Sequence, residues 1–451
     1  MSTEPSQNHV ASGLRRSIGL PDLVVYGLVF IGPAAAVSIF GPLDARSHGA
    51  VPVVYLVATV AMGFTAYSYA LMSREVPRAG SVFAYATAGI GPRTGFVAGW
   101  MVMLDYLLIP SVAYLFTGIA MNSFVPSVPA WAWTVAAVVV TTGLNLAGVK
   151  VAARAAAITV IVEVVALAMV LVGGVVVLVQ QGPVRGWLTP ITGVGGFSAA
   201  AVAAAVSVAV LSYLGFDAIA TFAEETTGDA RLVGRATLIC LVVAGLLFAA
   251  QTYVGALLSP TTPEQLAAHP EMQGSAYYDL VDVQIAHWLS IFLAVAKAVG
   301  ASFSAMVAQA AAARILLDMG RSSRLPAVVS RVNSRTGVPA IGLVVVAALN
   351  SLLAVWAATQ PNGLDTLVSV VDVGALTAFI LLHAAVVGYF YLRRRTQQRN
   401  VARHLVAPVV GGAILLTITA LASHRAQVVG LVWLVLGIAV AAVQEHRRVS
   451  T

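Results

Sequence analysis

The stretch SYLGFDAIATFAEET, from Ser212 to Thr226, decides the fold. It ends an apolar run that begins near Ala199, and it places Asp217 two residues after Gly215. An ionisable side chain at membrane depth is costly and faces a cavity or a partner, so it indicates a functional site. A neighbouring glycine favours a local opening of the helix, which is tolerated where the backbone lines a cavity. The stretch therefore predicts a membrane-spanning helix that is interrupted at the carboxylate.

The composition indicates a helical membrane protein. Hydrophobic residues make up 59% of the 451 residues and charged residues only 10%, and the mean hydropathy is +0.90. No soluble domain needs so apolar a chain, and uncharged stretches long enough to cross a bilayer recur throughout. The single cysteine, Cys240, permits neither an internal disulfide nor a cysteine metal cluster.

Apolar windows predict twelve membrane spans. Their approximate limits are residues 20–43, 50–72, 95–121, 130–148, 156–180, 199–222, 236–258, 285–313, 338–358, 367–391, 405–422 and 427–443. With both termini in the cytosol, only Arg46, Arg185 and Arg425 of the 25 Lys and Arg residues lie outside, and Lys297 lies within a span. This asymmetry predicts a multi-pass protein of the cytoplasmic membrane. The +7 net charge is then a topology signal, and no nucleic-acid partner is expected.

The first span carries an interruption of its own. Its sequence LVVYGLVFIGPAAAVSIFG holds Gly32 and Pro33 near the middle. Proline removes one backbone N–H and disfavours helix for the residue before it. A simple kink is the alternative interpretation. However, the sixth span is also interrupted, and paired interruptions in two halves are typical of a transporter built from two repeats.

The interruptions divide the chain into two repeats and an appended pair of spans. We expect the first repeat at residues 19–180, the second at residues 199–391, and the last two spans at residues 404–443. Residues 1–18 and 444–451 are expected to be cytosolic tails, because the first segment is polar and has no cleavable signal.

Several motifs spread along the chain resemble the amino acid–polyamine–organocation (APC) superfamily of transporters. They are GLVFIGPAA, PRAGSVFAYA, NLAGVK, LGFDAIATFAEET and ARILLDMGRSSRLP. Within it, LDYLLIP and YLGFDAIATFAEET are most similar to the putrescine importer group, and the resemblance covers about residues 14 to 443. It implies an all-α integral membrane protein with the LeuT-like five-plus-five inverted repeat, broken helices 1 and 6, and two added helices. It also implies import of a small amine or amino acid coupled to protons or sodium, with no enzymatic step and no other cofactor.

The resemblance also implies a substrate site between spans one, three, six, eight and ten. The unwound segments of spans one and six map onto Ile31, Gly32, Pro33 and Ala34, and onto Gly215, Phe216 and Asp217. Phe216 would occupy the position of the aromatic gate of the family.

Few charged side chains lie inside the predicted spans, so each can be weighed singly. They are Asp105, Glu163, Asp217, Lys297 and Asp372. Buried unpaired, these carboxylates would cost several kcal/mol each, so they must bind protons, pair, or receive a cation. A cationic substrate is one counter-ion, and a purely structural network is the alternative.

The break in span one bears on the substrate. In amino acid carriers of this fold, backbone N–H groups at a half-helix terminus bind the substrate carboxylate, and Pro33 removes one of them. We therefore expect a substrate with amines and no carboxylate, such as putrescine, with one ammonium at Asp217 and the other at Asp105. Three aromatic side chains are expected to add cation–π and packing contacts: Tyr106, Tyr213 and Phe216.

Coupling to an ion or proton is expected near spans five and eight. Many relatives carry a lysine at the position of Glu163, whereas here the lysine is Lys297 in span eight. Lys297 could pair with Glu163 or with Asp105. Lysine can release its proton and arginine cannot, which favours a titrating group over a static bridge. The residues expected to couple are Glu163, Lys297, Ser302, Ser304 and Asp372, although serines in such helices often bond to their own backbone.

The stretch from 259 to 282 is predicted to be the longest outer loop. Its acidic residues are Glu264, Glu271, Asp279 and Asp282. They would either enrich cations near the mouth of the site or simply be solvated.

Three other functions are alternatives to an importer of this kind. A permease for neutral or cationic amino acids is the alternative within the same class. An intramembrane enzyme would need a motif such as GxSxG or HExxH, and neither occurs in the sequence, so no catalytic or metal residue is predicted. A sensor that has lost transport would be expected to carry an appended domain. The sequence leaves a monomer and a homodimer both open.

Overall fold

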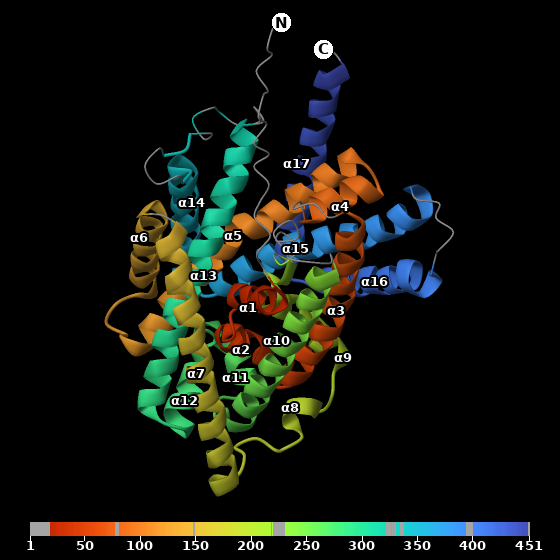
Figure 1. Ribbon diagram of the computed structural model, residues 1–451. Coiled ribbons are helices and arrows are strands. Elements are labelled where there is room, and N and C mark those ends of the chain that lie inside the picture. The colour runs from red at the N-terminus through yellow and green to blue at the C-terminus, as the bar shows by residue number, and fades with distance from the viewer. Residues whose placement is uncertain are drawn as a thin grey trace, which may run out of the picture.

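The structure is a computed structural model in which the described part of the chain is helical (Figure 1). It describes residues 19–76, 81–147, 149–217, 219, 231–321, 326, 328, 331–333, 338–393 and 400–449. The predicted tail 1–18, the PRAG motif at 77–80 and most of the second half of the sixth span therefore lie outside the described residues.

In chain order, the helices are α1 (Leu20–Ile31), α2 (Ala35–Arg46), α3 (Val51–Glu75), α4 (Ser81–Gly89), α5 (Pro92–Phe124), α6 (Ala130–Ala147), α7 (Val149–Gln181), α8 (Thr189–Thr192), α9 (Ala199–Ala209), η1 (Val210–Tyr213), α10 (Arg231–Leu258), α11 (Pro263–Ala268), η3 (Pro270–Met272), α12 (Ala276–Gln284), α13 (His287–Arg321), α14 (Ala340–Ala358), α15 (Gly363–Gly388), η5 (Tyr389–Arg393), η6 (Ala402–Val406), α16 (Ala407–Ala420) and α17 (His424–Val449).

Ten helices among the described residues are long and apolar enough to cross a membrane, and the bent pair α1–α2 brings the number to eleven. Each of these ten coincides with a predicted span, since a bilayer requires long apolar helices. The predicted first span is the bent pair. Of the predicted sixth span, the structure describes the shorter apolar helix Ala199–Tyr213 and the break that follows it.

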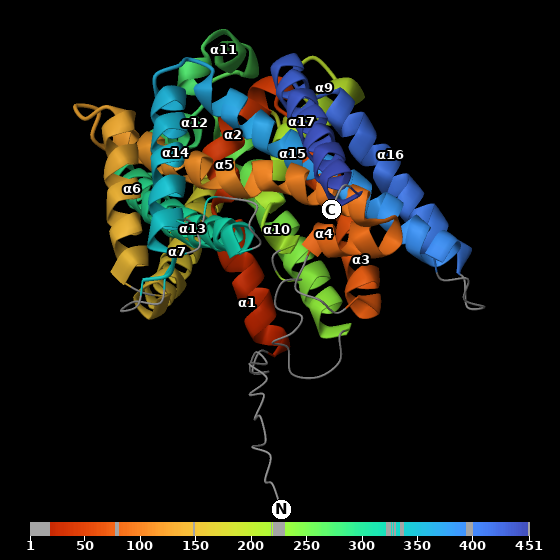
Figure 2. The same ribbon diagram turned by 90° about the horizontal axis from the view of Figure 1, so that it is seen from above.

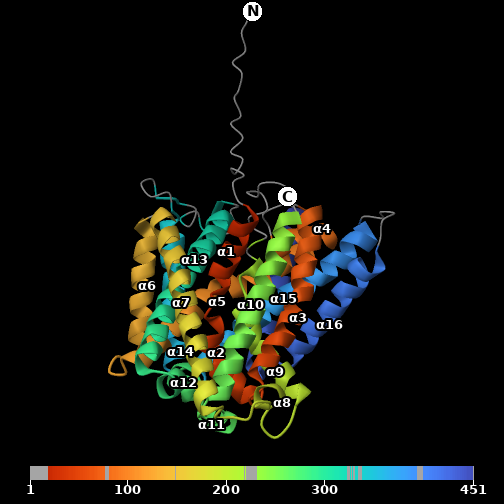
Figure 3. The ribbon, with the colours of Figure 1, turned by 60° about the horizontal axis from the view of Figure 1, so that its bottom comes forward.

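The helices form one bundle around α5. Figure 2 shows α6 and α16 at opposite edges, with α5 crossing between them. In Figure 3, α8, α11 and α12 lie together at one end of the bundle, and α4 lies at the other. We call the first of these the α11–α12 end.

The break in the first span lies at the predicted residues. α1 ends at Ile31, α2 begins at Ala35, and their axes differ by 48°. Gly32 has a φ of 75°, in the left-handed region that favours glycine. The amide of Gln251 donates a hydrogen bond of 3.0 Å to the carbonyl of Pro33, so α10 holds one of the backbone groups that the break exposes.

The break in the sixth span contacts the break in the first. The 3-10 turn η1 ends at Tyr213, and Gly215 has a φ of 110°. A Cβ atom on Gly215 would lie only 2.9 Å from the Cβ of Phe30 and 3.2 Å from its carbonyl carbon. Any other residue would push the two segments apart, so Gly215 permits both the backbone conformation and the approach.

A buried ion pair fixes the far half of the broken first span. Arg185 donates to both carboxylate oxygens of Asp44 at 2.8 and 2.7 Å, and the Asp44 side chain is fully buried. Arg185 also donates to Ser259 and to the carbonyl of Thr261. This bidentate arrangement ties α2 to the segments that follow α7 and α10.

The predicted outer loop is folded onto α2. Gly41 lies so close to this segment that a Cβ atom would stand 2.1 Å from the carbonyl oxygen of Gln273. The ring of Tyr277 packs edge-on against Phe40 at 5.3 Å, and its hydroxyl donates to the carbonyl of Gln251. The predicted outer loop thus packs on α2 and bonds to Gln251 of α10.

We expect Gly41→Ala to lower the unfolding temperature, because overpacking at such a contact costs about 1–3 kcal/mol. Gly143→Ala is the matched control. A Cβ there meets nothing within 4 Å, and alanine is the better helix former by roughly 0.5–1 kcal/mol. Thermal unfolding of the two purified variants checks this. Equal unfolding temperatures would contradict the packing of this segment on α2.

Candidate functional site

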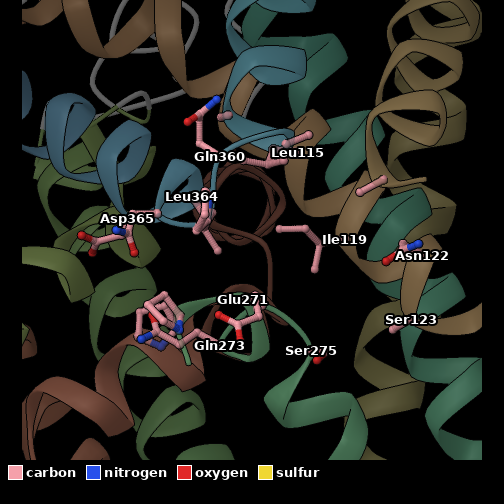
Figure 4. Close-up of a pocket in the computed structure, with 18 of the residues that line it drawn as sticks. Leu115, Ile119, Asn122, Ser123, Glu271, Gln273, Ser275, Gln360, Leu364 and Asp365 are labelled. Atoms are coloured by element: carbon pink, nitrogen blue, oxygen red, sulfur yellow. The ribbon is translucent and has the colours of Figure 1, made fainter. Parts of the chain in front are cut away.

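A large cavity opens at the α11–α12 end of the bundle, and we call it the vestibule (Figure 4). Its volume is about 540 Å³. Leu115 and Ile119 of α5 line one side, Glu271 and Ser275 a second, and Asp365 of α15 a third. The walls therefore come from parts of the chain that are far apart in sequence.

Carboxylates give the vestibule a negative lining: Glu271, Asp279 and Asp365. A hydrogen bond to its own backbone N–H and another from His269 hold the pKa of Glu271 below its ordinary value. Burial raises the pKa of Asp279, although the hydroxyl of Ser275 donates to it at 2.8 Å. Asp365 forms an ion pair with Arg46 at the end of α2. Such a lining concentrates cations near the opening.

A second, much smaller cavity lies where the two breaks meet, and we call it the central cavity. Its volume is about 70 Å³, which has room for only a few water molecules. Its lining comes from four parts of the chain: the first break, α5, the second break and α13. The residues are Phe30, Ile31, Gly32 and Ala35; Ile109, Val112, Ala113 and Phe116; Leu211, Ser212 and Leu214; and Lys297, Ala301 and Ser304. The cavity must widen before it can admit an organic substrate.

Lys297 pairs with Glu163 in this structure. Its Nζ lies 3.9 Å from Oε1 of Glu163, and the two side chains are 6% and 3% exposed. The ammonium also lies 5.8 Å from the centre of the Phe116 ring. Of the two partners predicted for Lys297, the structure therefore brings Glu163 into contact, and Lys297 itself lines the central cavity.

The carboxylate of Glu163 is held against the first break. The backbone N–H of Ala34 donates a hydrogen bond to it. Gly300 of α13 makes room for the carboxylate, since a Cβ on Gly300 would lie 2.0 Å from Oε1. The ion pair thus bonds to the same half-helix terminus that was predicted to bind substrate.

Asp217 lies beside the second break, next to α5. The hydroxyl of Tyr106 donates to Oδ2 at 3.4 Å, and the N–H of Gly215 donates to Oδ1 at 3.3 Å. Asp105, 3% exposed, is close enough for its charge to act on Asp217. The structure therefore brings together the three polar side chains predicted at this point.

Phe216, at the second break, belongs to a cluster of aromatic rings. Its ring packs against Tyr69 at 6.0 Å and against Phe379 at 5.7 Å. Tyr69 in turn contacts Tyr85 of α4 at 5.9 Å. These four aromatic rings, which we call the aromatic seal, join α3, α4, α15 and the second break.

Tyr213 lies elsewhere than the sequence predicted. Its hydroxyl donates to the carbonyl of Tyr55 at 3.0 Å and shares a hydrogen bond of 2.8 Å with Thr59. The ring packs against Phe248 of α10. Tyr213 is not among the residues that line the two cavities, so in this conformation it fixes η1 against α3 and α10.

Three further residues were predicted to take part in coupling: Ser302, Ser304 and Asp372. Ser304 lines the central cavity with Lys297. Ser302 donates to the carbonyl of Ala298 at 2.8 Å and lies 3.0 Å from the hydroxyl of Thr117, so it bonds to its own helix. Asp372 is 1% exposed, and neither of its oxygens has a hydrogen-bond partner within the described part of the chain.

Sequence reasoning missed most of the apolar wall and one polar residue. The wall on α5 follows a helical spacing from Asp105, through Ile109 and Val112 to Phe116. That spacing was a usable signal. Gln251, an uncharged polar residue inside an apolar span, was another, and it bonds to Pro33.

Comparison with known proteins agrees with this architecture. A family model described as amino acid permease matches residues 23–445. The chain belongs to this family. The match confirms the predicted membership of the APC superfamily, and it makes the protein a multi-pass membrane transporter.

Its relatives differ in the substrates that they are named for. The low-affinity putrescine importer PlaP of Escherichia coli (strain K12) is 29% identical over 450 residues, which cover 97% of this chain and 95% of PlaP. A vacuolar cationic amino acid transporter 2 of Arabidopsis thaliana is 28% identical, over 83% of this chain and 59% of that protein. The branched-chain amino acid permease BcaP of Lactococcus lactis is 27% identical, over 81% of this chain and 80% of that permease.

We expect Lys297→Met to destabilise this permease by about 3–5 kcal/mol, because it leaves the charge of Glu163 buried without its partner. The double variant Lys297→Met/Glu163→Gln should recover most of the loss, since it removes both charges. Thermal unfolding of wild type, both single variants and the double variant measures the coupling. A double variant as unstable as the worse single variant would show that the two side chains do not pair.

Proposed function

We propose that the protein is a secondary active importer of a small organic cation, with putrescine as the leading candidate. One observation carries the proposal. Asp105 and Asp372 are buried, Oδ1 of Asp105 and both carboxylate oxygens of Asp372 accept no hydrogen bond from the described groups, and Lys297 pairs with Glu163. Buried carboxylates of this kind require a counter-ion, and a substrate ammonium supplies one.

The hydrogen bonds at the first break favour a substrate without a carboxylate. Pro33 has no N–H to donate, its carbonyl accepts from Gln251, and the N–H of Ala34 donates to Glu163. The backbone donors on which an amino acid carrier of this fold relies are therefore absent or in use. The putrescine importer PlaP, similar over almost the full length of both chains, agrees with this choice.

In this proposal the two ends of a diamine bind in different places. One ammonium meets Asp217, whose other neighbours are Tyr106 and the N–H of Gly215. The second meets Asp105, on the same helix as Tyr106. The ring of Tyr106 adds a cation–π contact.

A cationic amino acid is the second candidate. Lys297 lines the central cavity next to Gly32, so it could bind a substrate carboxylate if it left Glu163. The side-chain ammonium of such a substrate would reach Asp105 or Asp217. Similarity to named cationic amino acid transporters supports this alternative.

The same proposal extends to topology and transport cycle. The protein would have twelve spans, with inverted repeats at residues 19–180 and 199–391, two added spans at 404–443, and both termini in the cytosol, as a monomer or homodimer. The α11–α12 end would then face outward. Substrate would enter through the vestibule while the aromatic seal is closed, and the seal would open toward the cytosol by alternating access.

Coupling of transport to a proton would use the ion pair of Lys297 and Glu163 at the first break. A proton that leaves Lys297 would break the ion pair with Glu163, whose carboxylate also accepts from the N–H of Ala34, so titration there would act on the break itself. Sodium is the other candidate ion, with Ser304 as a ligand, whereas Ser302 already donates to its own helix.

Uptake of radiolabelled putrescine into proteoliposomes tests the substrate. We expect unlabelled putrescine to compete better than lysine, and lysine better than alanine or leucine, because the last two lack a second ammonium. Asp217→Asn should lose most uptake, since a charge-assisted hydrogen bond contributes roughly 1.5–3 kcal/mol. Stronger competition by alanine or leucine would rule out the diamine, and no uptake of any amine would favour a sensor.

The same assay tests coupling. Lys297→Arg keeps the charge but cannot release its proton, so its uptake should lose much of the pH dependence of the wild type. A full pH dependence in this variant would exclude titration at Lys297.

A further inference from the structure

Asp372 stands out among the buried groups because it has no partner in the site described above. It lies on α15, is 1% exposed, and neither carboxylate oxygen accepts a hydrogen bond from any group that the structure describes. α15 packs closely on α5 there, since a Cβ on Gly374 would be 3.0 Å from the Cβ of Leu104. A bare buried carboxylate is costly, so its retention indicates a ligand.

A second buried carboxylate is close enough for its charge to act on Asp372. Asp105 of α5 is 3% exposed, and its Oδ1 likewise accepts no hydrogen bond from the described groups. The charges of Asp105 and Asp372 act on one another. The two side chains lie on helices that touch at Leu104 and Gly374, so the two carboxylates act on each other across the contact between α5 and α15.

The other charged groups around Asp372 do not neutralise it. Asp365, on α15 itself, is the second charge that acts on it, and Asp365 is paired with Arg46. The described parts of α3, α4, α9, α14, α16 and α17 contribute no further charge. Asp105 in turn faces Asp217, another carboxylate.

Two like charges in one buried place cannot both persist without a counter-ion. Such a pair binds one proton that the two carboxylates share. The affinity for that proton is then a property of the pair and not of either residue. Asp217 differs, because it accepts hydrogen bonds from Tyr106 and from the N–H of Gly215.

We propose that Asp105 and Asp372 form a subsite that holds one proton when empty and exchanges it for one ammonium end of a diamine. The inference rests on the proposed function and adds Asp372 to the substrate site. In the exchange, the carboxylic O–H bond breaks, the proton passes to water, and the ammonium takes its place. The total charge of the subsite and its occupant stays the same.

A line of carboxylates leads from the subsite toward the vestibule. Asp365 lines it and lies seven residues before Asp372, two helical turns and about 10 Å along the same face of α15. Asp365, Asp372, Asp105 and Asp217 thus form a row of carboxylates from the vestibule to the second break, each acting electrostatically on the next.

Isothermal titration calorimetry of the full-length protein tests the exchange. Binding heats in buffers with different enthalpies of protonation give the number of protons released per ligand. Putrescine should release about one proton, and n-butylamine, with the same carbon chain and one amine, about none, because only the second ammonium reaches the pair. Equal release by the two amines would overturn the subsite.

Single-residue variants test whether Asp372 takes part in binding the released proton. Asp372→Asn should bind putrescine more weakly and release almost no proton. Asp282→Asn, the same change at an exposed carboxylate beside His287, should release as many protons as the wild type. Undiminished release by Asp372→Asn would overturn the proposal, and the comparison of amines on wild-type protein decides it if that variant does not fold. Absence of putrescine binding would overturn the proposed function, whereas binding without proton release would overturn the subsite alone.

Discussion

The close approach of Gly215 to Phe30 is the contact on which the rest of the site depends. It joins the broken sixth span to the last turn of α1, just before the first break begins. Neither break would be stable alone at membrane depth, because each exposes backbone groups that lipid cannot bond. Placed together they enclose a polar centre, and Gln251 and Glu163 each bond to one exposed group of the first break.

The charged side chains around the polar centre form two groups. On the side of the first break, Lys297 and Glu163 balance each other. Beside the second break, the charges of Asp217 and Asp372 act on Asp105 or are acted on by it, and no described cation acts on Asp105 or Asp372. This asymmetry suits a cargo that carries its own positive charge, as the proposed function requires.

Much of this arrangement could be predicted from the sequence because the bilayer imposes simple rules. Long apolar windows gave the spans, and Pro33 gave the first break, since its missing N–H cannot continue a helix ladder. The choice between two partners for Lys297 needed the structure, because it depends on how α13 is rotated against α7. For Tyr213 the sequence could not show that its hydroxyl reaches Tyr55 in α3.

The most direct measurement is an electron cryomicroscopy map of the protein with putrescine bound. We expect helices that stop at Ile31 and at Tyr213, with ligand density between Gly32 and Gly215 that extends toward Asp105. Continuous first and sixth helices, or putrescine bound only outside the space between the two breaks, would contradict a substrate site built from two broken spans.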